Sequence, residues 1–222
     1  MEVYLEVGRR RAFAVALEWP GWCRAGRDEG GALAALIEYG ARYRTAVEGV
    51  ASVDVPAGGA ELRVVERLAG GAATDFGAPE AIPAADRRAL APAELEQLLA
   101  IHAACWSTLL DVARRASGRP LTSGPRGGGR SLPAILEHAA GAETAYLSQL
   151  GGRDAGAAGG ALALRDSFAA SARARAAGEL PDRGPRGGQR WPARYAIRRS
   201  AWHLLDHAWE IEDRAGLGAP DG

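Results

Sequence analysis

Hydrophobic and polar positions follow two different rhythms along the chain. Up to about residue 70, short apolar runs are separated by glycine, proline and arginine turns, a pattern typical of β-strands. These runs occupy residues 3–7, 12–19 and 61–68. Between them, apolar residues recur close to helical spacing after Asp28, which predicts a helix. We therefore expect residues 1–70 to form an α+β domain.

From about residue 90 the pattern is helical throughout. Four segments with helical patterning, the third of them weak, cover residues 91–118, 131–152, 161–178 and 192–214. Four helices with loops of roughly a dozen residues predict a bundle, which we assign to residues 90–222. Residues 71–89 between the two regions are rich in alanine, glycine and proline and predict a surface linker. The expected fold class is an α+β N-terminal domain followed by an all-α four-helix bundle.

The amino-acid composition gives no indication of binding to nucleic acid or membranes. The chain has 27 basic and 27 acidic residues, so a formal net charge of zero gives no general attraction to nucleic acid or anionic membranes. All the basic residues are arginine, which makes arginine richness a property of the whole chain rather than a sign of phosphate binding. There is no signal-peptide pattern at the N-terminus and no apolar run of membrane-spanning length. We expect a soluble, cytoplasmic protein whose two cysteines, Cys23 and Cys105, stay reduced and buried.

Two of the four histidines stand one helical turn apart. His203 and His207 lie on the same face of the last predicted helix, where two imidazoles can bind one metal ion. Leu204 takes the place of the glutamate that acts as general base in helical zinc proteases, which argues against a protease. A catalytic metal commonly has three protein ligands and one open position, so a third ligand is needed.

The third ligand could be His102 or His138. Small alanine side chains surround His138 on its predicted helix and leave room for a ligand, whereas leucine, cysteine and tryptophan crowd His102. In an antiparallel hairpin the two would also differ in height by roughly 10 Å, at about 1.5 Å per residue. We therefore predict a metal site of His138, His203 and His207, with Glu210 orienting His207. Three imidazoles favour zinc or nickel over magnesium or calcium.

Two similar glycine-rich segments each precede a helix that bears histidine. They read GPRGGGR at 124–130 and GPRGGQR at 184–190. Neither is a P-loop, because no Lys-Ser/Thr pair follows. One interpretation is a pair of simple turns. The other is that their arginines line a pocket mouth and bind an anion; these arginines are Arg126, Arg130, Arg186 and Arg190.

Residues 90–215 resemble the DinB/YfiT-like four-helix bundles. The resemblance is carried by ILEHAAGAETAYL at 135–147 and RYAIRRSAWHLLDHAWEIEDR at 194–214. It implies up-down-down-up winding and a divalent metal bound by His138, His203 and His207. The family includes transferases and isomerases that use low-molecular-weight thiols such as mycothiol or bacillithiol, and many members without known activity.

The N-terminal segment resembles the HicB-like antitoxin fold, a small β-sheet with one packed helix. The carrying residues are AFAVALEWPGWCRAGRDEGGALAALIEYG at 12–40. No helix-turn-helix or ribbon-helix-helix segment follows, so the DNA binding of that family does not carry over. This resemblance implies an accessory or interaction module.

Three hypotheses for function remain. The first is a metal-dependent transferase, isomerase or hydrolase that acts with a low-molecular-weight thiol on a small-molecule substrate. The second is a non-catalytic metal- or ligand-binding module whose N-terminal domain binds a partner. The third is that the histidines are ordinary core residues. The sequence assigns no catalytic residue, and a homodimer is compatible with it.

Overall fold

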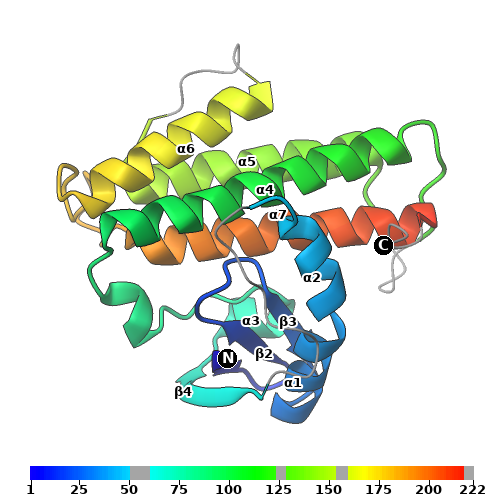
Figure 1. Cartoon of the computed structure of the whole chain (residues 1–222), viewed down its shortest axis with the longest axis horizontal. Coiled ribbons are helices and arrows are strands. Elements are labelled where there is room, and N and C mark those ends of the chain that lie inside the picture. The colour runs from blue at the N-terminus through cyan, green and yellow to red at the C-terminus, as the bar shows by residue number, and fades with distance from the viewer. Residues whose placement is uncertain (51–60, 124–128, 154–159, 218–222) are drawn as a thin grey trace.

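The protein consists of a layer of long helices above a small sheet flanked by shorter helices (Figure 1). The computed structural model describes residues 1–50, 61–123, 129–153 and 160–217. The strands are β1 (Glu2–Val7), β2 (Ala12–Ala16), β3 (Cys23–Gly26) and β4 (Arg63–Ala69). The helices are α1 (Glu29–Glu38), α2 (Gly40–Val47), α3 (Ala72–Phe76), the 3-10 helix η1 (Ala84–Arg87), α4 (Pro92–Ala116), α5 (Leu132–Leu150), α6 (Gly160–Ala176) and α7 (Ala193–Ala215). The predicted fold class is confirmed.

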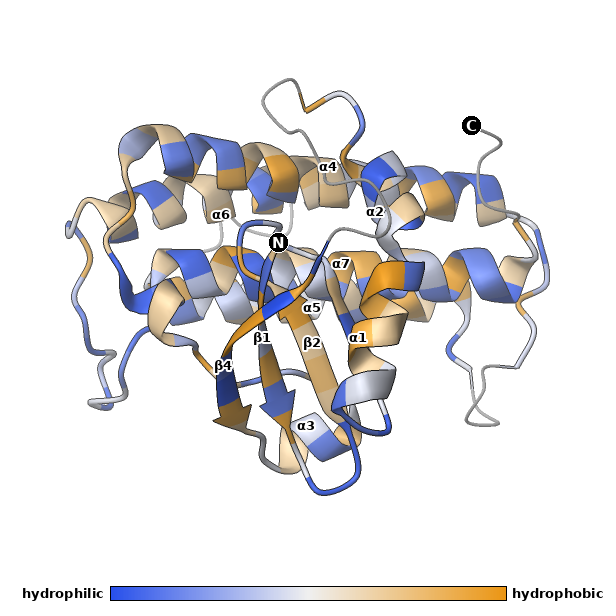
Figure 2. Cartoon of the chain, turned by 60° about the horizontal axis from the view of Figure 1, so that its bottom comes forward, coloured by the Kyte–Doolittle hydropathy of each residue, from blue (hydrophilic) through white to orange (hydrophobic). Residues whose placement is uncertain are grey.

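The sheet has the strand order β3-β2-β1-β4. β2 pairs antiparallel with both β1 and β3, whereas β4 pairs parallel with β1. Every residue of the central strand β2 is buried, and its alternate side chains enter two different apolar clusters. The edge strand β4 instead alternates exposed and half-buried residues. Figure 2 shows this contrast between the hydrophobic β2 and the mixed β4. The central strand is therefore enclosed on both faces, as its unbroken apolar run requires.

The helical stretch after Asp28 is divided into two helices. The Asp28 carboxylate accepts a hydrogen bond of 2.8 Å from the Gly31 amide and caps α1, as an N-cap aspartate does. The break falls at Tyr39, where α1 ends and α2 begins. Trp22 packs against this break, because its indole donates to the Leu36 carbonyl at 2.8 Å and its ring stacks on Tyr43. The periodicity predicted the helical residues but not this division.

The four long helices wind up-down-down-up. The end of α7 lies beside the segment after α4, since the Thr122 amide donates to the Arg214 carbonyl at 2.9 Å. The start of α7 lies beside the end of α5, since the Trp191 amide donates to the Gln149 carbonyl at 3.0 Å. Helix α7 is thus parallel to α4 and antiparallel to α5, and α5 and α6 run in the same direction (Figure 1). No helix in the described ranges is both long and apolar enough to cross a membrane.

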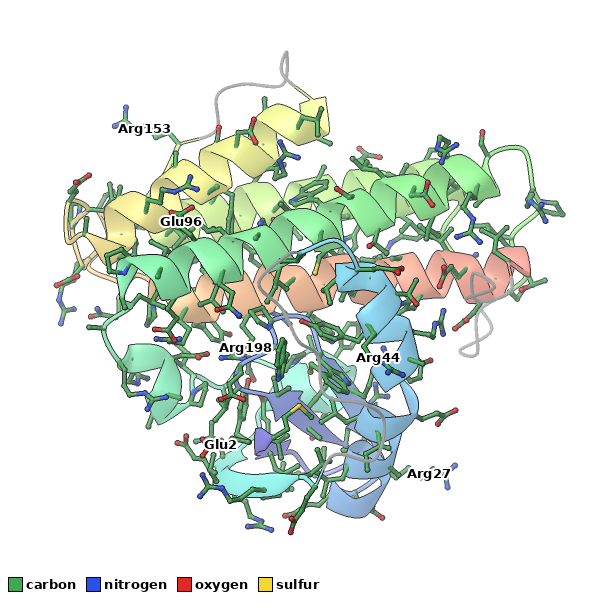
Figure 3. The ribbon with its side chains drawn as sticks, viewed as in Figure 1. Glu2, Arg27, Arg44, Glu96, Arg153 and Arg198 are labelled. Carbon is green, nitrogen blue, oxygen red and sulfur yellow. The ribbon has the colours of Figure 1, made fainter. Side chains whose placement is uncertain are left out.

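One arginine fastens the bundle to the sheet. Arg198 of α7 is buried, and it donates to both oxygens of buried Asp86, the nearest at 2.8 Å. It also donates to the carbonyls of Ala16 and Leu17, at 2.5 and 2.7 Å. Figure 3 places Arg198 between the bundle and the sheet. Apolar residues of the sheet region and of the bundle form one continuous cluster, so the two regions share a hydrophobic core to which α7 contributes.

The segment 71–89, predicted as a surface linker, carries α3 and η1 and is partly anchored. The buried Glu6 of β1 accepts hydrogen bonds from the Thr74 hydroxyl and from the amides of Glu80 and Ala81. Asp86 is buried against Arg198. Each of these contacts joins residues that are far apart in the sequence. The composition of the segment 71–89 therefore could not predict them.

Candidate metal centre

Helix α7 presents two histidines to a third on α5. The helix begins after Pro192 and ends at Gly216, whose φ of 61° lies in the left-handed region that favours glycine. His203 and His207 are one turn apart on it, and each is only 7% exposed. His138 faces them from α5 and is the most exposed of the three. The antiparallel packing of α5 on α7 thus brings together the three predicted ligands.

The ring nitrogens of these histidines converge. The Nε2 atom of His203 lies 3.1 Å from that of His207 and 3.3 Å from that of His138. One nitrogen from each ring lies within 4.8 Å of the others. Two nitrogens bound tetrahedrally to zinc, at about 2.0–2.1 Å each, are themselves about 3.3–3.4 Å apart. The cluster therefore has the spacing needed to hold a metal ion.

Glu210 lies within hydrogen-bond distance of His207, the residue that we expect it to orient. Its Oε2 atom lies 2.8 Å from Nδ1 of His207, and its Oε1 atom accepts from Arg214 at 2.8 Å. The hydrogen bond from His207 and then that from Arg214 lower the pKa of Glu210, so the carboxylate is ionised. Nδ1 of His207 must then carry the proton, which leaves the lone pair of Nε2 for the cluster. Arg214 is itself held by the carbonyl of Thr122, at 2.8 Å.

Burial favours the neutral form of two of the three histidines. Loss of hydration, together with repulsion from His207 and Arg199, lowers the pKa of His203 to about 2. Burial and then the charge of His207 also lower the pKa of His138. A neutral imidazole is the form that binds metal. The surroundings therefore favour the ligand form of His138 and His203 at neutral pH.

His102 lies apart from this cluster, in agreement with its exclusion from the predicted ligands. Its Nε2 atom is 2.6 Å from the Ser200 hydroxyl, which donates to the Glu143 carboxylate at 2.7 Å. All three side chains are buried, and the imidazole stacks on Phe168 with ring centres 4.5 Å apart. The network joins all four long helices. Sequence reasoning missed Glu143 and Ser200, although a glutamate on the apolar face of α5 was a sign of a buried partner.

The arginines of the two glycine-rich segments differ in position. Arg126 lies outside the described residues. The Arg130 carbonyl accepts a hydrogen bond of 2.9 Å from Arg214, the partner of Glu210 beside the cluster. Arg190 donates to the Ser148 carbonyl at the other end of α5, and Arg186 is exposed. Residues 184–188 close a turn through their backbone, so this segment has the structure of the simple turn that was the first interpretation.

Arg199 is the site residue that sequence reasoning missed. Its guanidinium lies over the ring of Trp202, 4.5 Å from the centroid, and 5.7 Å from that of Tyr146. The same two rings lie 5.9 and 5.8 Å from the imidazole of His203. The signal was present in the sequence, because positions 199, 203 and 207 share one helical face.

Neither cysteine can take part in chemistry at this site. Cys23 belongs to the sheet and Cys105 to the inner face of α4, and both are buried. Burial raises the pKa of both thiols far above the ordinary value, so both stay protonated and unreactive.

A separate cavity of about 720 Å³ lies between α2, α4 and α7. Trp209, Arg42, Arg115 and Glu212 contribute to its wall, and none of the three clustered histidines does. The four charged and aromatic groups are engaged with one another: Arg42 pairs with Glu212 at 2.8 Å and lies over the Trp209 ring. The histidine cluster therefore lies outside this cavity.

Comparison with known proteins found no family model, no curated protein and no solved structure that matches the chain. The DinB-like and HicB-like resemblances thus stay predictions. What the structure itself shows is a mixed four-stranded sheet with helices, followed by a helical bundle that carries a cluster of three histidines.

Proposed function

We propose that this protein is a divalent-metal-dependent enzyme of the DinB type, in which His138, His203 and His207 hold the metal. The observation that carries the proposal is the convergence of the Nε2 atoms, at 3.1 and 3.3 Å. Since His207 turns a lone pair toward its neighbours, a cation would bind where the rings alone repel one another. The donor set thus fits a metal ion better than it fits a packed core.

The donor set also indicates which metal and what kind of site. Three neutral imidazoles suit zinc or nickel. Within the described residues the cluster has three protein donors, the number typical of a catalytic zinc site that keeps one position for substrate. His138, the most exposed member, lies on the side from which a small molecule can approach.

The residues around the cluster have separable tasks. A bound metal of this kind supplies Lewis acidity, which lowers the pKa of a thiol or water that binds it. Glu210 holds the proton of His207 at Nδ1, and Arg214 holds Glu210. Tyr146 and Trp202 flank His203 and exclude bulk water from it. The protein groups thus orient the ligands and keep the site dry.

The buried cysteines support an external thiol as the nucleophile. Cys23 and Cys105 cannot reach the cluster or ionise, so thiol chemistry needs a low-molecular-weight co-substrate. The reaction class is transfer, isomerisation or hydrolysis of a small molecule.

A second candidate function is a non-catalytic metal-binding module. The observation in its favour is that α7, which carries two ligands, also contacts the sheet through Arg198 and through Trp202 against Phe13. Metal binding would then stabilise the helix on which the HicB-like domain rests, and that domain would recruit a partner.

Metal analysis followed by thiol binding separates the two candidates. Protein purified without chelator or histidine tag should contain about one zinc or nickel ion per chain, and His203→Ala should contain none. The cobalt-substituted protein should change its absorption spectrum on addition of 2-mercaptoethanol if a coordination position is open to thiols. Metal without a spectral response would favour the binding module. Equal metal content in the wild type and His203→Ala would contradict both.

A further inference from the structure

Helix α7 contains four arginines, and one of them has no polar partner in the part of the chain that the structure describes. The other three contact carboxylates: Arg194 with Glu94, Arg198 with Asp86, and Arg214 with Glu210. Among the described residues, Arg199 makes no hydrogen bond or ion pair, yet its Nη1 atom is buried. Arg199 lies on the same helical face as His203 and His207.

A buried guanidinium nitrogen without an acceptor is costly. Leaving a buried donor unsatisfied costs about 1–3 kcal/mol, and more for a charged group. The faces of Trp202 and Tyr146 offset part of this cost by cation–π contact. Such contacts use the face of the guanidinium and leave its N–H groups, which point outward in its plane, free to donate. These N–H groups match two oxygens of a carboxylate or phosphate.

The free donors lie beside the histidine cluster. Arg199 is four residues before His203, and side chains at that spacing are about 5–6 Å apart at Cβ. Both residues also contact the same rings, Tyr146 and Trp202. The two carboxylates on this face of α7 are already engaged: Asp206 pairs with Arg24, and Glu210 with His207 and Arg214. Within the described part of the chain, no acidic side chain therefore pairs with Arg199.

We propose that Arg199 recognises an oxyanion, a carboxylate or phosphate group, of the small molecule that binds at the three-histidine cluster. The inference rests on the proposed function for the identity of the cluster as a substrate site, and it adds the charge of the substrate. Trp202 and Tyr146 hold the guanidinium flat while the histidines receive the reacting end. The substrate is thus a small anion whose charged group lies about one helical turn from its reacting group.

The test compares two thiols that differ only in charge. The cobalt-substituted protein is titrated with 3-mercaptopropionate and with 3-mercaptopropionamide, and binding is followed by the absorption spectrum. The wild type should bind the carboxylate about tenfold more tightly than the amide, as expected for one charge-assisted hydrogen-bonded pair. Arg199→Gln should lose this preference and bind the amide as the wild type does.

Two further variants separate recognition from packing. Arg199→Lys keeps the charge but not the two-pronged geometry, so it should retain only part of the preference. Arg165→Gln removes an arginine that is paired with Asp166 on α6, and it should behave as the wild type. A preference that survives in Arg199→Gln, in protein that still binds cobalt, would overturn the inference and leave Arg199 as a stacking residue only.

A metal-free arm keeps the inference distinct from the proposed function. Chelator-treated wild type and Arg199→Gln are titrated calorimetrically with acetate and with inorganic phosphate. Weak binding to the wild type that is lost in Arg199→Gln supports the inference even if the wild type binds no cobalt, a result that would overturn the proposed function alone. The preferred anion identifies the oxyanion as carboxylate or phosphate. Absence of binding to either anion, together with equal affinity for the two thiols, would refute the assignment of Arg199.

Discussion

The bundle contains two groups of buried polar side chains with histidine, and they differ in how their polar atoms are satisfied. In the first, the Ser200 hydroxyl links His102 to Glu143, so the hydrogen bonds stay within the group. In the second, the three clustered histidines turn their Nε2 atoms toward one another, so these nitrogens converge on one point. The first arrangement has the features of a structural network. The second has the features of a site that a ligand completes.

Substitutions in the three-histidine cluster should remove the metal, whereas substitutions in the His102 network should not, and this should be the largest difference between the two groups. His207→Ala removes one of the three proposed ligands and should reduce bound metal below detection by elemental analysis. His102→Ala should keep about one ion per chain, because its ring contacts Ser200 and Phe168 instead of the cluster. Loss of metal in His102→Ala, in protein that remains folded, would show that the two groups are not independent.

Removal of Glu143 should produce the largest loss of stability without loss of metal. Glu143→Ala leaves the buried Ser200 hydroxyl, the partner of His102, without its acceptor, at a cost of about 2–3 kcal/mol in the free energy of unfolding. Urea denaturation measures this change. Glu137→Ala, an exposed position on the same helix, is the matched control and should change stability little. An unchanged urea midpoint in Glu143→Ala would mean that the network does not stabilise the bundle.

Glu210→Gln tests how much the hydrogen bond between Glu210 and His207 contributes to metal affinity. The amide can still accept a hydrogen bond from Nδ1, but it loses the negative charge that stabilises the pair with Arg214. Removal of such an outer partner costs about 10–100-fold in metal affinity. Competition with a zinc chelator measures the loss. Asp206→Asn is the control, since Asp206 pairs with Arg24 of the sheet rather than with a histidine. Wild-type affinity in Glu210→Gln would exclude an orienting role for the carboxylate.

The metal-free cluster should make stability depend on pH. The pKa of His203 is lowered to about 2 in the folded protein, chiefly by burial, while the unfolded chain keeps the ordinary value of about 6.5. Below about pH 6.5 the unfolded state therefore binds more protons, and stability falls as pH falls. His203 alone should contribute about 1 kcal/mol between pH 6.5 and 5.5. Urea unfolding of chelator-treated His203→Leu should show a flatter pH dependence than the wild type; parallel curves would contradict the prediction.

The sequence alone determined the features that depend on local geometry, namely the long helices and the residues that share a helical face. Helical spacing placed His203, His207 and Glu210 on one face, because an α-helix repeats every 3.6 residues whatever it packs against. The same periodicity predicted the four long helices, and Asp28 marked the start of α1 through a bond to its own neighbour. The small side chains around His138 favoured it over His102, and the packing of α5 on α7 agrees with that choice.

Only the tertiary structure decided which distant groups pair. Arg198 and Asp86 meet across 112 residues, and Ser200 meets Glu143 across 57, so no local pattern announces either contact. The status of Arg199 is of the same kind. The sequence does not distinguish an arginine that has a carboxylate partner from one that has none. Only the packed structure shows that three arginines of α7 are paired and that Arg199, among the described residues, is not. Such pairings depend on how the helices are stacked and on which groups the stacking removes from water, and neither is a property of neighbouring residues.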